Sequence, residues 1–408
     1  MMNAMTQDTS AERRAWRNTL RRKVCSRNDF ANNAQYVHTP YDLCHEMVER
    51  LDQYGSLHTA QTFLTFNLEF VETLCYSMGI EKSKIWFVTE CLEKAAIARF
   101  HPRYSGINVI YAEYLLTWNT NNMKFDVIAG NPPYQDGTGA TGIGHTLWDQ
   151  FVEKSLSLLS EGGHLCYVHP AGWRDSDGQF KDTQKLIKSK KVKYLEIHDR
   201  ADGVRTFGVQ TAYDWYILQN VKSEGKTIVK SQSGETCEID LNGMEFIPNS
   251  MFKAIQSLMA TDGESRVEVI RSESAYEIRK PHMSREKNEK HQYPCVYTVL
   301  RDGTINLFYS STKGRGHFGI PKVIFTNGTS LPIVDDKGKY GLTQFAYGIV
   351  DTPENLSLIQ KAMMTERFIA IMNECQLVGK HRYARKAISL FKKDFWKQFV
   401  DENGNELK

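Results

Sequence analysis

The sequence predicts an α/β fold for the first half of the chain, with a parallel or mixed sheet and helices on both faces, followed by a C-terminal α+β domain. Short apolar runs alternate there with stretches of helical apolar spacing, and this alternation stops near residue 220. The 408 residues are 41% hydrophobic, which is enough for two or three cores. Ordinary Gly, Pro and aromatic contents exclude disordered, collagen-like and coiled-coil chains.

The strands are expected where apolar runs are short and bounded by polar turns, at residues 62–65, 85–89, 108–111, 125–129, 164–168, 194–198 and 212–218. The helices are expected where apolar residues recur every three or four positions, at residues 40–51, 70–78, 92–100, 146–159 and 180–188. We therefore divide the chain into a basic N-terminal arm (1–34), an α/β domain (35–222) and a second domain (223–408).

The cysteine pattern and the lengths of the apolar runs indicate the cellular compartment in which the protein works. The eight cysteines are scattered singly, with no Cys-x-x-Cys pair, which is typical of a reduced cytoplasmic protein and argues against a zinc module. The histidines show no metal-ligand spacing, and we expect no metal. No apolar run approaches the roughly 20 residues of a membrane span, and the first nine residues do not resemble a signal peptide.

The chain has a net charge of only +3, because two basic segments are offset by an acidic remainder. Residues 10–27 and 380–397 each hold seven cations and one acid, so together they carry +12 while the rest of the chain carries −9. Aromatic residues interleave the second segment, a combination that suits contacts with phosphates and bases. The predicted nucleic-acid contacts are Arg13, Arg17, Arg21, Lys380, Arg382, Arg385, Lys386 and Lys392. The alternative is a solvated helix face with a few core anchors.

The most informative segment is an apolar strand, residues 125–129, that ends in Gly130 and Asn131-Pro132-Pro133-Tyr134. This loop lies at the carboxyl edge of the predicted sheet, where ligands of α/β proteins bind. The Asn131 side-chain oxygen and a neighbouring backbone carbonyl offer two acceptors to an exocyclic amine, and the prolines fix their direction. Tyr134 offers a face on which an extruded base could stack. The alternative is a proline-rich turn without a role in chemistry.

With these residues the sequence resembles the N6-adenine DNA methyltransferases of the Asn-Pro-Pro-Tyr type with γ-class motif order. Similar motifs are residues 35–40 (Gln-Tyr-Val-His-Thr-Pro), 158–165, 170–173 and 207–211. The resemblance implies a Rossmann-like, seven-stranded class I methyltransferase sheet, S-adenosylmethionine as methyl donor, and double-stranded DNA as substrate in a restriction-modification system. It also implies that residues 223–408 form the target-recognition domain.

The resemblance assigns roles to individual residues. Asn131, Pro132, Pro133 and Tyr134 would act in catalysis, and the cofactor would be held by Tyr36, Thr39, Pro40, Glu90, Glu113 and Asn131. Glu90 and Glu113 each follow a predicted strand, so they could also be solvated strand-end acids. Residues 137–142 match Gly-x-Gly-x-x-Gly, but they follow the catalytic loop and not the first strand, which favours a lid or a plain flexible loop over a dinucleotide site.

One motif departs from the family. Where the family has Asp-Pro-x-x-Gly-x-Gly-x-Phe, residues 62–70 place Phe66 and Leu68 at the glycine positions, and these side chains are expected to crowd the methionine end of the cofactor. The alternative function is therefore a pseudo-methyltransferase that binds DNA or a partner subunit. A related enzyme that transfers a different group is a third possibility.

Overall fold

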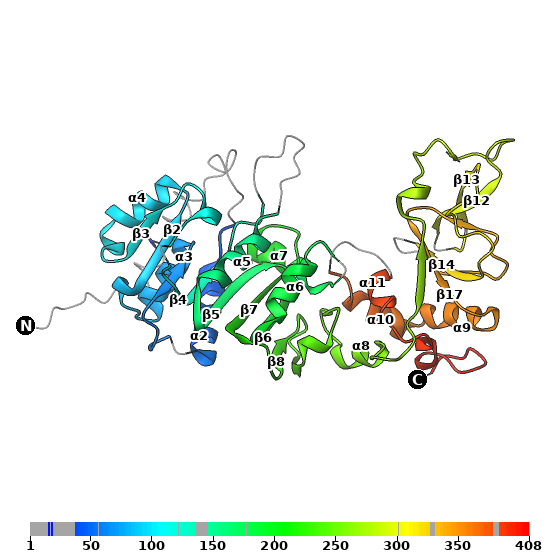
Figure 1. Cartoon of the computed structure of the whole chain (residues 1–408). Coiled ribbons are helices and arrows are strands. Elements are labelled where there is room, and N and C mark those ends of the chain that lie inside the picture. The colour runs from blue at the N-terminus through cyan, green and yellow to red at the C-terminus, as the bar shows by residue number, and fades with distance from the viewer. Residues whose placement is uncertain are drawn as a thin grey trace, which may run out of the picture. The chain divides into compact units, whose positions relative to one another are not determined.

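The computed structural model describes residues 15, 16, 18, 37–55, 57–120, 122–135, 146–176, 178–300, 302–326, 331–377 and 383–407. It divides into two compact units, Met1–Gly243 and Met244–Lys408 (Figure 1). The first unit extends past residue 222, where the sequence placed the domain boundary. Two further strands, β8 (Thr227–Lys230) and β9 (Thr236–Ile239), continue the first sheet beyond that point.

The first unit is built on one nine-stranded sheet in the order β3-β2-β1-β4-β5-β7-β6-β8-β9. Its other strands are β1 (Phe63–Thr65), β2 (Ile85–Thr89), β3 (Asn108–Tyr111), β4 (Phe125–Gly130), β5 (Leu159–Pro170), β6 (Lys190–His198) and β7 (Tyr213–Lys222). Strands β1 to β5 pair in parallel, whereas β7 runs antiparallel to both β5 and β6. The predicted α/β fold is thus confirmed, with two more strands than the seven expected.

Helices cover both faces of this sheet, as predicted. They are α2 (Tyr41–Tyr54), α3 (Leu68–Glu72), α4 (Leu92–Phe100), α5 (Trp148–Leu158), α6 (Lys181–Lys188) and α7 (Arg200–Phe207). Alternate residues of β5 assign the faces: Cys166 belongs to the core cluster that includes α2, and its thiol lies 3.6 Å from the Met47 carbonyl. Tyr167, on the opposite face, hydrogen-bonds Ser155 of α5 at 2.5 Å.

The strand order reverses between β1 and β4. The chain builds β1, β2 and β3 toward one side of the sheet and then returns to place β4 on the other side of β1. At such a switch point the loops that follow the two strands separate and leave a crevice at the carboxyl edge, where ligands bind. The connection after β1 begins at Phe66, and the loop after β4 begins at Asn131.

The second unit has two four-stranded sheets, ordered β10-β17-β14-β15 and β11-β13-β12-β16. Its strands are β10 (Glu268–Arg271), β11 (Met283–Ser284), β12 (Tyr293–Val299), β13 (Ile305–Ser310), β14 (Lys322–Thr326), β15 (Ile333–Asp335), β16 (Gly341–Leu342) and β17 (Ala346–Val350). Its helices are α8 (Phe252–Leu258), α9 (Pro353–Met364), α10 (Glu366–Glu374) and α11 (Arg385–Ile388). Residues of all four helices share one core with β14 and β17, so this unit is α+β, as predicted.

Gly203 lets helix α7 approach the following turn without a side chain between them. A β-carbon at this position would lie 1.9 Å from the backbone oxygen of Thr211. Alanine normally stabilises a helix relative to glycine by about 1 kcal/mol. Here we expect Gly203→Ala to destabilise the first unit by about 1–3 kcal/mol, because the backbone of residues 209–211 must move.

Urea unfolding of wild type and Gly203→Ala measures this effect. Gly243→Ala is the matched control, because a β-carbon there meets only the Asp240 carboxylate, at 3.8 Å. An unchanged or raised midpoint for Gly203→Ala would show that the turn yields without cost.

Candidate active site

The loop after β4 is buried at the switch point of the sheet. Asn131, Pro132, Pro133 and Tyr134 are all buried, and Asn131 is only 2% exposed. β4 pairs in parallel with β1 on one side and with β5 on the other, so the loop leaves the middle of the sheet at its carboxyl edge. The four residues that the sequence singled out therefore occupy the position where the fold places a ligand.

Within the described residues, the Asn131 side-chain amide makes hydrogen bonds through its nitrogen but not through its oxygen. Its Nδ2 donates to the backbone oxygen of Val37 and to Oγ1 of Thr39, both at 3.1 Å. The Val37 carbonyl accepts only, so the amide nitrogen and not the oxygen must face it. The Oδ1 atom is buried and has no hydrogen-bond partner among the described residues. A buried acceptor left open in this way is costly, which is typical of a functional site.

Tyr134 completes the loop with an aromatic ring that is 7% exposed. Its hydroxyl is buried and makes no hydrogen bond within the described chain. Burial raises the pKa of Tyr134, and the neighbouring Asn131 amide offsets only part of that increase. The phenol is therefore neutral at physiological pH.

Asn67, which the sequence did not single out, holds the backbone of the catalytic loop. Its Oδ1 accepts from the Asn131 backbone N–H at 2.8 Å, and its Nδ2 donates to the Asn131 backbone oxygen at 3.0 Å. Asn67 is 3% exposed, so both hydrogen bonds are dry. A β-carbon on Gly130 would lie 3.0 Å from the Asn67 oxygen, which explains a small residue there. One side chain thus links the turn after β1 to the loop after β4.

The connection after β1 differs from the expected glycine-rich loop. Only Phe66 and Asn67 separate β1 from α3. Phe66 packs edge-on against Phe151 of α5, with ring centroids 5.6 Å apart, and Leu68 belongs to the core. Both side chains therefore lie in the protein interior. In place of a glycine-rich loop, the protein has a short turn that contains Asn67.

An ion pair ties the N-terminal motif to helix α3. Nδ1 of His38 lies 2.6 Å from Oε1 of Glu69, and their side chains are 21% and 13% exposed. Burial alone would raise the pKa of Glu69, but the hydrogen bond and charge of His38 outweigh it and lower that pKa below 4.5. The neighbouring Thr39 and Asn131 are therefore held in register with the first turn of α3.

Since the pKa of Glu69 is lowered in the folded protein, its contribution to stability is present above about pH 4.5 and is lost as the pH falls through the folded-state pKa. We expect Glu69→Gln to lower the free energy of unfolding by on the order of 1 kcal/mol at pH 7 and to match wild type at acidic pH. Urea unfolding at both pH values tests this. The control is Glu49→Gln, which removes the exposed His45–Glu49 pair and should change nothing measurable. A difference that persists at low pH would contradict the ionic origin.

Glu90 and Glu113 lie at the carboxyl ends of neighbouring strands. Glu90 directly follows β2 and is half-buried, whereas Glu113 lies two residues beyond β3 and is exposed. β2 and β3 pair through Thr89 and Tyr111, so both acids lie at the same edge as the catalytic loop. Beside them, Leu92 is 67% exposed and Tyr114 is 68% exposed. Acids and apolar surface at this edge suit the ribose and the base of a nucleoside.

Several predicted residues lie outside the described part of the chain. These are Tyr36, Arg13, Arg17, Arg21, Lys380, Arg382 and the glycine-rich stretch 137–142. Of the N-terminal arm, Trp16 is described: its ring stacks on His101 at 4.0 Å, and its Nε1 donates to the Tyr104 hydroxyl at 3.0 Å. His101 and Tyr104 precede β3, so this anchor lies at the amino edge, opposite the catalytic loop.

The second basic segment is only partly a surface feature. Its aromatic residues Tyr383, Phe391, Phe395 and Trp396 are buried in the core of the second unit, so they are not a stacking surface for bases. Arg385, Lys386 and Lys392 are half-buried. The Arg385 guanidinium lies 5.7 Å over the ring of Tyr347, and Lys392 pairs with Glu264 at 3.2 Å. The cations remain candidates for phosphate contacts, but the interleaved rings are core anchors.

The described residues contain neither a candidate metal site nor a candidate membrane span. No group of three or more His, Cys, Asp or Glu side chains is arranged to hold a metal ion. Within the same residues, no helix has the length and apolar character that a membrane span requires.

Comparison with known proteins agrees with the geometry. Residues 79–204 match the family model of the Eco57I restriction-modification methylases. A protein of Mycoplasma pneumoniae named an uncharacterized adenine-specific methylase is 31% identical over 200 residues, which cover 46% of this chain and 45% of the relative. The chain therefore spans about half the length of the curated relative that it matches.

Solved structures that align with parts of this chain include a restriction enzyme and a restriction-modification subunit. The type IIG restriction endonuclease BpuSI aligns with 95% of this chain and 65% of its own, at a TM-score of 0.49 and 10% identity. The methyltransferase subunit of a Streptococcus thermophilus type I restriction-modification system covers 51% of each chain, at a TM-score of 0.38 and 15% identity. The resemblance to adenine methyltransferases is confirmed by the family model: residues 79–204 match the Eco57I restriction-modification methylase family.

Proposed function

We propose that this protein methylates the N6 amine of adenine in double-stranded DNA, with S-adenosylmethionine as donor, as the modification enzyme of a restriction-modification system in the cytoplasm. The observation that carries the proposal is the open, buried Oδ1 of Asn131, whose amide nitrogen is fixed by Val37 and Thr39. The matching family and the adenine-specific relative support the same reaction class.

The chemistry follows from what the loop offers to an amine. The lone pair of adenine N6 is delocalised into the ring, so the nitrogen is a poor nucleophile. Oδ1 of Asn131 and the backbone oxygen of Pro132 would each accept one N–H, which favours a pyramidal nitrogen with a localised lone pair. Tyr134 would stack on the base, which must first leave the duplex. Pro133 would fix the direction of the loop.

The donor supplies an electrophilic methyl group when bound. The residues present fit its nucleoside end, where Glu90 and Glu113 would accept from the ribose and adenine between the exposed Leu92 and Tyr114. Thr39, Pro40, Asn131 and Tyr36 would hold the methionine end. No glycine-rich turn contributes there, because Asn67 takes its place and already uses both backbone groups of Asn131.

The basic segments and the second unit would bind the DNA. We assign phosphate contacts to the basic residues Arg13, Arg17, Arg21, Lys380, Arg382, Arg385, Lys386 and Lys392, and target recognition to the second unit. An inactive, DNA-binding pseudo-methyltransferase that works with a partner subunit is the rival. The intact arrangement around Asn131 favours the enzyme, because a protein without chemistry has no use for a buried open acceptor.

Labelled S-adenosylmethionine, mixed-sequence duplex DNA and the purified full chain test the proposal. We expect label in DNA, and N6-methyladenine after digestion to nucleosides. Calorimetric titration with the donor, in the absence of DNA, gives a second readout. Neither transfer nor donor binding would overturn the proposal and support the pseudo-methyltransferase. Label in cytosine would assign a different reaction to the same loop.

A further inference from the structure

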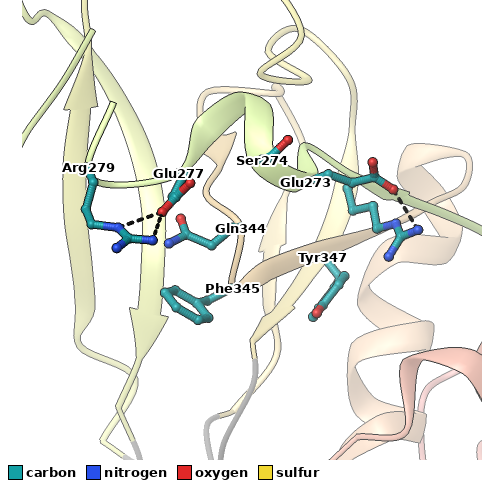
Figure 2. A pocket seen from close by; sticks show the side chains of 8 residues that line it. Glu273, Ser274, Glu277, Arg279, Gln344, Phe345 and Tyr347 are labelled. Carbon is teal, nitrogen blue, oxygen red and sulfur yellow. Dashed lines mark hydrogen bonds and ion pairs between the residues drawn. The ribbon is translucent and has the colours of Figure 1, made fainter. Parts of the chain in front are cut away.

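The second unit contains a pocket of about 470 Å³ between β10, the short 3₁₀ turn Glu273–Tyr276 and the start of β17. Its volume lies in the range of sites for small planar groups. Side chains from residues 271–279 form one wall, and residues 344–347 form the other (Figure 2). None of these residues belongs to the catalytic loop, so the pocket is distinct from the candidate active site.

Aromatic rings form one wall. Phe345 and Tyr347 are two positions apart and project from the same side of the chain (Figure 2). Each ring is braced from behind, because Phe345 packs edge-on against Tyr297 at 5.5 Å and Tyr347 packs on Phe325 at 5.4 Å. Both side chains are half-buried. Because the Arg385 guanidinium also lies 5.7 Å over the Tyr347 ring, Phe345 is the ring that a ligand could contact more fully.

A polar side chain on the same wall is oriented in advance. The Gln344 side-chain oxygen accepts from the Ile278 backbone N–H at 3.1 Å. This hydrogen bond orients the amide so that its NH₂ group faces away from Ile278, and no hydrogen bond within the described residues uses those two N–H donors. Figure 2 places Gln344 between Glu277 and Phe345, where a ligand lying on the ring would meet it.

Two arginines border the pocket, and each is already neutralised. Nε of Arg279 donates to Glu277 at 2.6 Å, and Arg271 pairs with Glu273 at 2.6 Å. The four charges cancel, so the pocket lacks the excess of cations that a phosphate or an acidic peptide requires. Each guanidinium has five N–H bonds and retains donors beyond those that face its carboxylate. The lining is thus neutral, aromatic and rich in donors.

Backbone geometry indicates that the surrounding structure enforces the conformation of the wall formed by residues 271–279. Glu273 has φ +48, in the left-handed region that side chains rarely adopt. The neighbouring His317, with φ +59, hydrogen-bonds the Arg271 backbone oxygen through Nε2 at 2.9 Å. Strain of this kind persists only where the surrounding structure enforces it, and it concentrates at binding sites.

We propose that this pocket reads one guanine of the DNA substrate. Among the bases, guanine presents two adjacent acceptors, N7 and O6, on its major-groove edge. Gln344 and the N–H groups of Arg279 that Glu277 leaves unused would donate to these atoms, while Phe345 and Tyr347 would border the groove edge of the base. Gln344 is the specificity-determining residue, because the hydrogen bond from Ile278 orients its NH₂ group, and not its oxygen, toward the base. The inference rests on the proposed DNA substrate but not on methyl transfer.

Selection of duplexes from a random pool by the immobilised full chain tests the assignment without any need for activity. We expect wild type to enrich a motif with at least one guanine. Gln344→Glu keeps an acceptor for the Ile278 N–H but replaces the donors, so preference for guanine should fall at least about tenfold at one position and stay unchanged at the others. Gln256→Glu introduces the same charge on an exposed residue of α8 and should keep the wild-type motif.

The selection can contradict the guanine assignment in three ways. An unchanged motif for Gln344→Glu, a wild-type motif without guanine, or no enrichment by wild type would overturn the assignment. Equal melting temperatures of wild type and variant establish that the fold is retained. If labelled donor gives no transfer while the selection succeeds as expected, the proposed methylation fails and the base-reading pocket stands.

Discussion

Asn131→Ala is expected to lower methyl transfer to DNA by about 10²–10³-fold, the effect of removing one preorganised polar group from an active site. The substitution removes the open Oδ1 that would accept from the adenine amine. It also frees Val37 and Thr39 from their shared donor, so segment 37–39 loses its anchor. The measurement is the initial rate of label transfer at saturating donor and DNA.

Two further variants separate these contributions. Asn131→Asp keeps an acceptor but turns a carboxylate oxygen toward the Val37 carbonyl, so we expect a rate between those of wild type and Asn131→Ala. Asn242→Ala removes an exposed side-chain amide that donates to Ser223 in the same unit and should leave the rate unchanged. A rate for Asn131→Ala within threefold of wild type would mean that the active site lies elsewhere.

Asn67→Asp is expected to cost about 10²-fold in kcat while leaving the KM for DNA nearly unchanged. An oxygen would replace the Nδ2 that lies 3.0 Å from the Asn131 backbone oxygen, so two acceptors would face each other in a dry site. The loop should then shift by a fraction of an ångström, enough to misplace the catalytic acceptor. Asn67 does not touch the base in this scheme and acts as a positioning residue.

The split between kcat and KM distinguishes positioning from general destabilisation. Asn67→Ala removes both hydrogen bonds without adding repulsion and should lie between wild type and Asn67→Asp in rate. Both variants should lower the melting temperature. A variant with a lowered melting temperature and a wild-type kcat would assign Asn67 a structural role alone.

Much of the α/β domain could be predicted from the sequence because its central strands are continuous apolar runs. Strands β2 and β3 were predicted at their observed bounds. β8 and β9 were missed because they are short and have exposed or half-buried residues, so they lack the apolar signal of buried strands. Helix α7 was missed as well, since Gly203 interrupts a weak apolar pattern and Asp199, its N-cap, stands in a run of polar residues.

The candidate site could be predicted from the sequence where its residues follow one another along the chain. Asn131 to Tyr134 form one run, whereas Asn67 meets Asn131 across 64 positions, and no local pattern records that contact. Comparison with the glycine-rich motif drew attention to Phe66 and Leu68, which are buried core residues. In the second basic segment, spacing could not separate stacking surfaces from core anchors, because Phe391 and Phe395 recur at the same helical interval in either case.

The clamp between Asn67 and the Asn131 backbone also limits what can be changed in this protein. Grafting a glycine-rich turn after β1 would leave the N–H and C=O of residue 131 buried without partners. Conversely, any larger residue at position 130 requires that the Asn67 oxygen move away. The two turns therefore depend on each other, and a chimera that exchanges only one of them should lose the hydrogen bonds that hold the Asn131 backbone.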